Sequence, residues 1–351
     1  MKDLFGFLNS GLGVGQLALL GSLLLVSASA ETVFTDPSGY VKLGNTTAGE
    51  DAVAANKDVY ISIPFESTLE RVGTVASATA NSITFSGSPG WSTSPAQWEP
   101  NPTPYCVIVN SGAENGLRAV VSTNTEDTLT VTLSSPGDLT NVSAGDEVLI
   151  RRCWTLQTFF APMNLPGGTQ LLLRDETLTG INQPANEGFV YGGGNWFDNA
   201  TFADSNNVIL HPGESFVLRS PSGAAIPELV AFGDVSTSSL RNSLVKDGDD
   251  PQGEDLFVAS MSPVPALASS LNIPVSNGDQ LLVFSPEGTG INQPASSSFV
   301  FGAGSWFDNI TFNDVTSELT IEPGVGYVLR RSSSSPIFEE WMEVAPFQVD
   351  N

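Results

Sequence analysis

Basic residues are scarce in this chain. Thirteen Lys and Arg stand against 38 Asp and Glu, which gives a net charge of −25 at pH 7. A field of that sign repels phosphate backbones and anionic lipid, so nucleic acid is not an expected partner. The acidic residues form no long runs, and their simplest role is to keep the protein in solution.

Histidine is almost absent, since His211 is the only one. Ser-His-Asp and Cys-His catalysis therefore lack a general base unless His211 is that base. His211 directly precedes a Pro-Gly turn signal, which is a structural position. The chain also lacks a nucleophile elbow, a phosphate-binding loop, a dinucleotide fingerprint and zinc-ligand spacing. A glycosidase needs two carboxylates, but among 38 acidic residues some pair will be close by chance. We therefore expect no enzyme.

Cysteine is limited to Cys106 and Cys153. Both lie in apolar stretches that are typical of strands, and an exported chain meets an oxidising compartment in which two thiols pair. The sequence predicts a disulfide between them. Two free, buried thiols are the alternative, because cysteine also behaves as a small core residue.

Apolar residues with a helical period are nearly missing from the mature chain. Short runs rich in Val, Ile, Thr and Phe alternate instead with clusters of Gly, Pro, Asn, Asp and Ser, as in 82–85, 128–133 and 147–150. This pattern predicts an all-β protein.

The first thirty residues have the features of a signal peptide. Lys2 precedes an apolar run that ends at Val26, and Ala28-Ser-Ala30 fits a signal-peptidase site, so we expect cleavage before Glu31. Glycines interrupt the run, which is unlike a transmembrane anchor, and no second apolar stretch follows. We expect a soluble mature chain without a transmembrane segment. Secretion, the outer cell surface and the periplasm remain open as destinations.

One stretch of the sequence occurs twice. The 22 residues that begin at Ile181 and the 22 that begin at Ile291 agree at 15 positions. The similarity continues downstream, where each copy has Pro-Gly followed by a strand pattern that ends in Arg219 or Arg330. Pro-Gly favours a tight turn because proline fixes φ and glycine accepts a positive φ.

The repeat predicts two duplicated β-sandwich or barrel modules, with a small barrel-like β domain inserted into the first. The segment 71–152 has no counterpart in the second copy, whereas the stretches before and after it do. A polar stretch rich in Gly and Pro separates the copies. The expected organisation is a signal peptide at 1–30, a first module at 31–70 plus 153–235, an insert at 71–152, a linker at 236–254 and a second module at 255–351.

These landmarks resemble an uncharacterised family of exported, paralogous bacterial proteins. The residues that carry the resemblance are Thr35-Asp-Pro-Ser-Gly-Tyr-Val41, Gly145-Asp146, Trp154-Thr-Leu156, Gly180-Ile-Asn182 and Gly290-Ile-Asn292. Each of the two Gly-Ile-Asn motifs is followed by aromatic residues, a Trp and a strand pattern that ends in Arg. The resemblance covers nearly the whole mature chain. It implies no activity, ligand or catalytic residue, and the run of tyrosines expected before each Trp is replaced by 189–194 and 299–304.

Four residues are candidates for binding a sugar. Trp196 and Trp306 could act as platforms for a sugar ring, with Asp198 and Asp308 beside them. The alternative is that a Trp at matching places in two modules belongs to a shared core, because it buries a large apolar area.

The predicted linker contains the only candidate ligands for a metal. Carboxylates are ligands that Ca²⁺ prefers, but Pro251 breaks the spacing of an EF-hand loop, so a solvated linker is the alternative. The candidates are Asp247, Asp249, Asp250 and Glu254. No other cofactor is indicated.

The leading functional hypothesis is an exported, non-enzymatic β protein that is a component of a surface, a matrix or an assembly. The alternative is a carbohydrate-binding module or carbohydrate-active enzyme built on the repeated Trp and Asp residues. The corresponding partners are a second copy of the chain or a surface polysaccharide.

Overall fold

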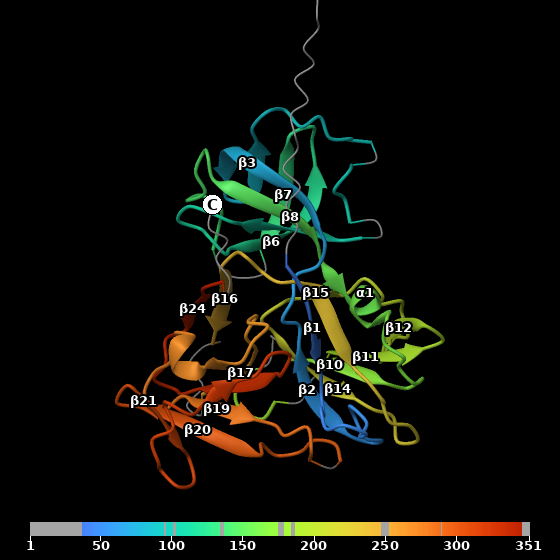
Figure 1. Ribbon diagram of the computed structural model, residues 1–351. Helices are drawn as coiled ribbons and strands as arrows, with labels where there is room; N and C mark the ends of the chain where they lie inside the picture. Colours follow the sequence, from blue (N-terminus) through green and yellow to red (C-terminus); the bar gives the residue numbers. More distant parts are fainter. Residues whose placement is uncertain are drawn as a thin grey trace, which may run out of the picture. The chain divides into compact units, whose positions relative to one another are not determined.

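The computed structural model of the chain describes residues 37–94, 96–100, 103–133, 137–174, 179–183, 187–246, 253–288 and 290–345 (Figure 1). Within these ranges the chain forms 24 strands, one α-helix at Leu156–Phe160 (α1) and one 3-10 helix at Ala268–Ser270 (η1). The prediction of an all-β protein is confirmed. The predicted signal peptide lies outside the described residues.

Two five-stranded antiparallel sheets have the same strand order. The first is β12-β11-β10-β14-β2 and the second is β21-β20-β19-β23-β17. Their bounds, in that order, are Asn195–Asp198, Glu187–Gly192, Gln170–Leu173, Ser215–Arg219 and Asp58–Ser62, then Ser305–Asp308, Ser297–Gly302, Gln280–Val283, Tyr327–Arg331 and Glu254–Val258. The register also matches, since Gln170 pairs with Arg219 as Gln280 pairs with Arg330. That the two modules arose by duplication stays a prediction.

Each sheet is accompanied by two short strand pairs, again in matching order along the chain. The pairs of the first module are β9 (Trp154–Thr155) with β13 (Ile209–Leu210) and β1 (Ser38–Lys42) with β15 (Val230–Asp234). Those of the second are β18 (Ala266–Leu267) with β22 (Thr320–Ile321) and β16 (Leu240–Val245) with β24 (Phe338–Glu343).

The expected linker is shorter than the sequence suggested. Leu240–Val245 form β16, and Leu240 and Leu244 are buried, so this stretch belongs to the second module in the place that β1 has in the first. Its apolar residues, Leu240, Leu244 and Val245, do not alternate with polar ones, which hid the strand. Residues 247–252 of the predicted linker lie outside the described residues, and its last residue, Glu254, begins β17.

The segment between β2 and β9 closes into a six-stranded barrel of order β3-β4-β7-β6-β5-β8. The strands are Leu69–Thr79, Ser82–Phe85, Thr128–Leu133, Arg118–Asn124, Tyr105–Val109 and Glu147–Arg152. Its first and last strands pair with each other, beginning at Leu69 with Arg151, so the chain enters and leaves the barrel at neighbouring strands. The predicted barrel-like fold of this segment is confirmed. Its independence as a domain stays a prediction.

Each of the three parts has its own apolar core. Trp196 lies in the first module's core, Trp91 and Trp98 in the barrel's, and Trp306 with Trp341 in the second module's. Burial of such aromatic side chains removes large apolar areas from water and is the main stabilising contribution to a β fold of this kind.

The first module contains a helical turn that brings additional aromatic residues into its core. Thr155 caps α1, with reciprocal hydrogen bonds to Thr158 at 3.2 and 2.9 Å. Phe160 packs against Trp196, with ring centroids 5.2 Å apart. The corresponding 3-10 helix of the second module is Ala-Ser-Ser and supplies no aromatic ring.

Candidate functional site

The repeated Gly-Ile-Asn motifs join the two modules. In the first module Arg219 donates from Nε to Asp58 Oδ1 (2.6 Å) and from Nη2 to Asp58 Oδ2 (2.8 Å). Asn292 of the second module donates its backbone N–H to Asp58 Oδ2 (2.7 Å), and its Oδ1 accepts from Arg219 Nη2 (2.8 Å). The backbone N–H of Asp58 donates to Gly290 O (3.2 Å). The motif of the second module thus completes an ion pair of the first.

The same contacts occur in the opposite direction. Arg330 donates to both carboxylate oxygens of Asp255 (2.7 and 2.9 Å) and to Asn182 Oδ1 (2.8 Å). The backbone N–H of Asn182 donates to Asp255 Oδ2 (2.7 Å), and that of Asp255 donates to Gly180 O (3.2 Å). We call the two sets together the reciprocal clamp: Asp58, Arg219 and Asn292 with Asp255, Arg330 and Asn182.

The clamp explains why the motif contains Gly and Asn. Asn182 and Asn292 have φ of 56° and 53°, and Gly180 and Gly290 have φ of 96° and 90°. Glycine adopts this left-handed region freely, and asparagine tolerates it better than other side chains do. An amide at this position also supplies the oxygen that accepts from the arginine, so one residue meets both demands.

The Pro-Gly turns cover the outer strands of the sheets. Ser62 N–H at the end of β2 donates to Gly324 O (3.0 Å), and Ala259 N–H after β17 donates to Gly213 O (2.9 Å). In addition, Tyr60 of β2 stacks on Phe284, with centroids 3.9 Å apart and an interplanar angle of 15°. Each module therefore covers an edge strand of the other, which protects both from pairing with foreign strands.

Trp196 and Trp306 are not placed to bind a sugar. Their side chains have exposed fractions of 0 % and 3 %, inside the cores of the two modules. Each packs against an aromatic residue of the neighbouring strand, Tyr191 and Phe301, with centroids 5.3 Å apart in both cases. A ring buried in this way has no free face for a ligand, so the core alternative describes both residues.

Asp198 and Asp308 each organise a loop. Asp308 Oδ1 accepts from Ile310 N–H (3.0 Å), Thr311 N–H (2.6 Å) and Thr311 Oγ1 (2.8 Å), and hydrogen bonds from Thr311 lower the pKa of Asp308. Asp198 accepts the same three bonds from Ala200 and Thr201 at 3.1, 2.6 and 2.7 Å, which lower its pKa too. These carboxylates hold turns in shape, a role that leaves neither as a proton donor at neutral pH.

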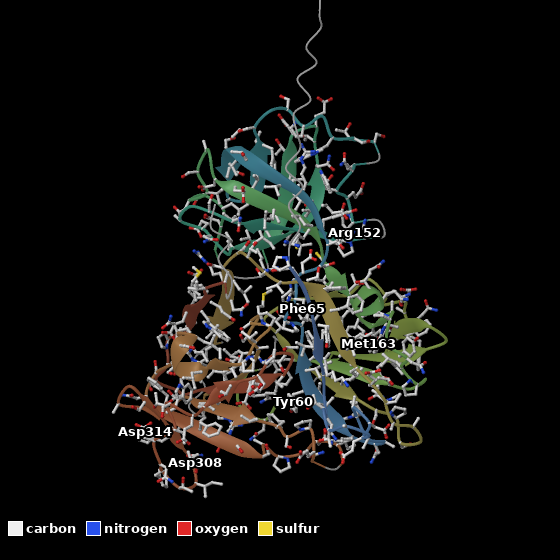
Figure 2. All side chains as sticks on the ribbon, in the orientation of Figure 1. Tyr60, Phe65, Arg152, Met163, Asp308 and Asp314 are labelled. Carbon is white, nitrogen blue, oxygen red and sulfur yellow. The ribbon has the colours of Figure 1, made fainter. Side chains whose placement is uncertain are left out.

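The two turns present apolar side chains that sequence reasoning missed. Phe202 and Phe312 have φ of 58° and 59°, and both side chains are 71 % exposed; Ile310 is 80 % exposed. Figure 2 labels Asp308, the last residue of β21, where the loop begins. A left-handed conformation costs a bulky residue about 1–2 kcal/mol, and exposure adds to this cost. The signal in the sequence was the repeated motif Phe-Asp-Asn-x-Thr-Phe, whose second Phe falls in a turn that needs no aromatic residue.

Cys106 and Cys153 are free thiols joined by a hydrogen bond between their side chains. The bond lowers the pKa of the Cys106 thiol, whereas donation to Cys106 and burial raise that of Cys153. The structure therefore brings the predicted partners together, and the disulfide itself stays a prediction.

The surroundings of the thiols are charged but closed. Arg118 lies beside them in a bidentate ion pair with buried Glu66, with 3.1 Å between Nη1 and Oε2. Burial lowers the pKa of nearby His211 to about 4, so the imidazole is neutral at pH 7. The cavity that all these residues line measures about 20 Å³, which is room for one water molecule. A substrate does not fit there.

We expect oxidation with glutathione disulfide to join Cys106 and Cys153. The two thiols lose two protons and two electrons to the reagent, which is reduced to two thiols. Closing a loop of about 48 residues stabilises the fold by roughly 4 kcal/mol in the chain-entropy model. The measurement is alkylation of the denatured, unreduced protein, together with melting before and after reduction. Cys106→Ser is the control and should show no change with reductant; two alkylated thiols after oxidation would refute the bridge.

The calcium candidates are only partly described. Asp247, Asp249 and Asp250 lie outside the described residues. Glu254 is buried at the start of β17, where it forms an ion pair with Arg174. In the part of the chain that the structure describes, no group of three or more His, Cys, Asp or Glu side chains is arranged to hold a metal ion.

A large open groove lies beside β1. It has a volume of about 800 Å³ and combines the end of β1 with β19, β20 and the segment that leads to β23. Most of its lining side chains are apolar or aromatic, and the lining also includes Lys42, Glu318 and Glu322. The main apolar members are Val283, Phe284, Phe299, Val315, Leu319 and Val325. We call it the β1 groove.

Comparison of the chain with protein-family models, with curated proteins and with solved structures gave no match. The resemblance to a family of exported bacterial proteins therefore stays a prediction. Among the described residues, no helix has the length and apolar character needed to cross a membrane.

Proposed function

We propose that this chain is an exported, non-enzymatic β protein that serves as a structural or assembly component of a cell surface or extracellular matrix. The observation that carries this proposal is the reciprocal clamp. Six polar side chains from both modules are used to fix one module against the other, with two bidentate ion pairs and hydrogen bonds at 2.6 to 2.9 Å.

The barrel is attached to both modules in a similar way. Arg118 of the barrel pairs with Glu66 of the first module, and Glu114 pairs with Arg241 of the second at 2.6 Å. These pairs are largely buried, so replacing one partner leaves an uncompensated charge. Such ion pairs hold the barrel in a fixed position against the two modules, and a rigid arrangement of this kind is suited to a component of an assembly.

The loops support the same proposal. Phe202, Ile310 and Phe312 are held out to solvent on turns that Asp198 and Asp308 fix by hydrogen bonds. Exposed apolar side chains on a pre-organised backbone are suited to contact with another macromolecule, because little conformational entropy is lost on binding.

The proposal is tested by locating the protein and by removing it. In cells that make the chain, an antibody to the mature protein should find it with the surface or matrix fraction, and deletion of its gene should weaken that layer against detergent or shear. Recovery of all the protein as a freely diffusing species in the medium, with an unaltered layer in the deletion strain, would contradict this function.

Polysaccharide binding is the second candidate, supported by a different pair of residues from the one the sequence indicated. Tyr40 and Phe232 are direct cross-strand partners in β1 and β15, and both are exposed. Two neighbouring aromatic rings on a ladder form an apolar face on which a sugar can stack. Retention on insoluble polysaccharide that is lost in the Tyr40→Ala, Phe232→Ala double variant would favour this candidate.

A further inference from the structure

The outer edge of β1 has no partner strand. In its sheet β1 pairs only with β15, and Leu43 N–H donates to Leu229 O (2.9 Å) just beyond the end of the strand. Backbone groups of an antiparallel pair alternate in direction along each strand, so the N–H and C=O of Tyr40 and Lys42 point away from β15. No described residue forms a hydrogen bond with these backbone groups. β1 therefore presents a free strand edge.

The free edge borders the β1 groove, because Lys42 belongs both to the edge and to the lining of the groove. Phe189 of the first module is buried, whereas Phe299 at the matching position is half-buried and lines the groove. A volume of about 800 Å³ with aromatic lining has the size and character of a binding site. A strand edge beside an apolar groove is suited to an extended peptide, because main-chain hydrogen bonds hold the peptide and the groove receives its alternate side chains.

The groove carries uncompensated negative charge. Glu318 and Glu322 of its lining are exposed, and in the described part of the chain neither carboxylate forms an ion pair. The lysine of the lining, Lys42, lies 3.8 Å from Glu228, which already balances its charge. The whole chain has a net charge of −25. A basic partner is therefore attracted to the groove, whereas an acidic one, including a second copy of this chain, is repelled.

We propose that an extended, basic segment of another protein binds in the β1 groove as a third strand beside β1. Apolar side chains at alternate positions of this segment enter the groove toward Phe299 and Val315, and Lys or Arg near its ends pair with Glu318 and Glu322. The inference rests on the proposed assembly function and names the chemistry of the partner. The added strand also covers the edge of β1, which protects that edge from pairing with foreign strands.

The two carboxylates of the groove have no counterpart in the first module. Glu322 directly precedes the Pro-Gly turn of the second module, and the matching residue of the first module is His211, which is neutral at pH 7 because burial lowers its pKa to about 4. Glu318 lies where the second copy is one residue longer than the first, between the repeated Trp and the Pro-Gly turn. We therefore expect one peptide site in each chain.

Fluorescence anisotropy with the labelled peptide Lys-Lys-Val-Thr-Val-Thr-Val-Lys-Lys tests the proposal. The mature chain should bind one peptide, with an affinity that falls as NaCl screens the ion pairs. The Glu318→Gln, Glu322→Gln double variant should raise Kd about tenfold, because two exposed ion pairs are lost. Glu99→Gln, Glu126→Gln is the matched control, since it removes the same charge from exposed positions of the barrel, and it should bind like the parent. No binding by the parent at low salt, or equal weakening in both double variants, would overturn the proposal.

Two substitutions of Lys42 test the strand edge separately from charge. Lys42→Pro removes the outward N–H without breaking a hydrogen bond to β15, so it should raise Kd about tenfold. Lys42→Gln removes the same positive charge but keeps the N–H, so it should bind the basic peptide at least as tightly as the parent does. Equal affinities of the two variants would contradict strand addition.

N-methylated peptides repeat this test on the unaltered protein. The N–H groups of the Val and Thr residues lie on opposite edges of an extended peptide, so methylation of the set that faces β1 should abolish binding. Unchanged affinity of both methylated peptides would show that an acidic chain merely attracts a cation, and would refute the proposal. Displacement of the peptide by a soluble polysaccharide, together with unchanged binding of the methylated peptides, would assign the groove to a sugar instead.

The binding data and the deletion strain separate this inference from the proposed function. If the parent does not bind the peptide while the deletion strain has a weakened surface layer, the peptide site is wrong although the proposed function stands. If the peptide binds with the expected effects of the variants but the deletion strain keeps a normal layer, the peptide site stands and the proposed function fails.

Discussion

Trp306→Ala should lower the free energy of unfolding by about 3–5 kcal/mol. The indole has an exposed fraction of 3 %, and it packs against Phe301 in the core of the second module. Replacement by alanine leaves a cavity that the sheet can fill only in part. Urea unfolding of parent and variant, analysed for the free energy in water, measures the loss.

Phe312→Ala is the matched control, because its aromatic ring is exposed in the same module. A change at such a surface position should be within about 1 kcal/mol. If Trp306→Ala melts like the parent but no longer retains a polysaccharide that the parent binds, the core assignment is wrong and the ring is part of a binding site.

Asp255→Ala should destabilise the chain by about 3 kcal/mol, the lower end for loss of one partner of a buried pair. Arg330 would keep only Asn182 as a partner, and the backbone N–H of Asn182 would lose its acceptor. Since Asp58 has the matching role, Asp58→Ala should cost a similar amount. The measurement is again the free energy of unfolding in urea.

The control for the clamp is Glu228→Ala. Glu228 pairs with Lys42 at 3.8 Å, and both side chains are more than half exposed. Such a surface pair contributes about 0–1 kcal/mol, so this variant should unfold like the parent. An Asp255→Ala variant that also unfolds like the parent would show that the clamp orders the modules without stabilising them.

The repeat made much of the fold predictable. Pro-Gly followed by a strand that ends in Arg219 or Arg330 marked β14 and β23, and the unmatched segment before Trp154 marked the barrel. The failure at Leu240–Val245 has a physical cause. This strand lacks a strict alternation of apolar and polar residues, and its partner β24 lies about a hundred residues away, so only tertiary pairing identifies it.

The clamp was not predictable from one copy of the motif. Its landmarks were visible, since Asp58 and Asp255 open matching strands and the Gly-Ile-Asn motifs recur. Nothing in the sequence indicates, however, that Asn182 accepts from Arg330 of the other module and not from Arg219 of its own module. The exchange depends on how two edge strands approach, which no local spacing encodes.

The position of the barrel between β2 and β9 has a consequence for the order of folding. β2 pairs with β14, a partner that the ribosome makes only after the whole barrel. The six barrel strands lie within one continuous stretch, and once folded they bring Thr68 and Arg152 to a backbone hydrogen bond at 3.1 Å. This shortens the loop between β2 and β14 and saves about 0.6 kcal/mol of closure entropy for each halving of its length. We therefore expect the barrel to form first and the first sheet to follow. The clamp should close last, because its Arg330 lies on β23, the last strand of the second sheet to be made.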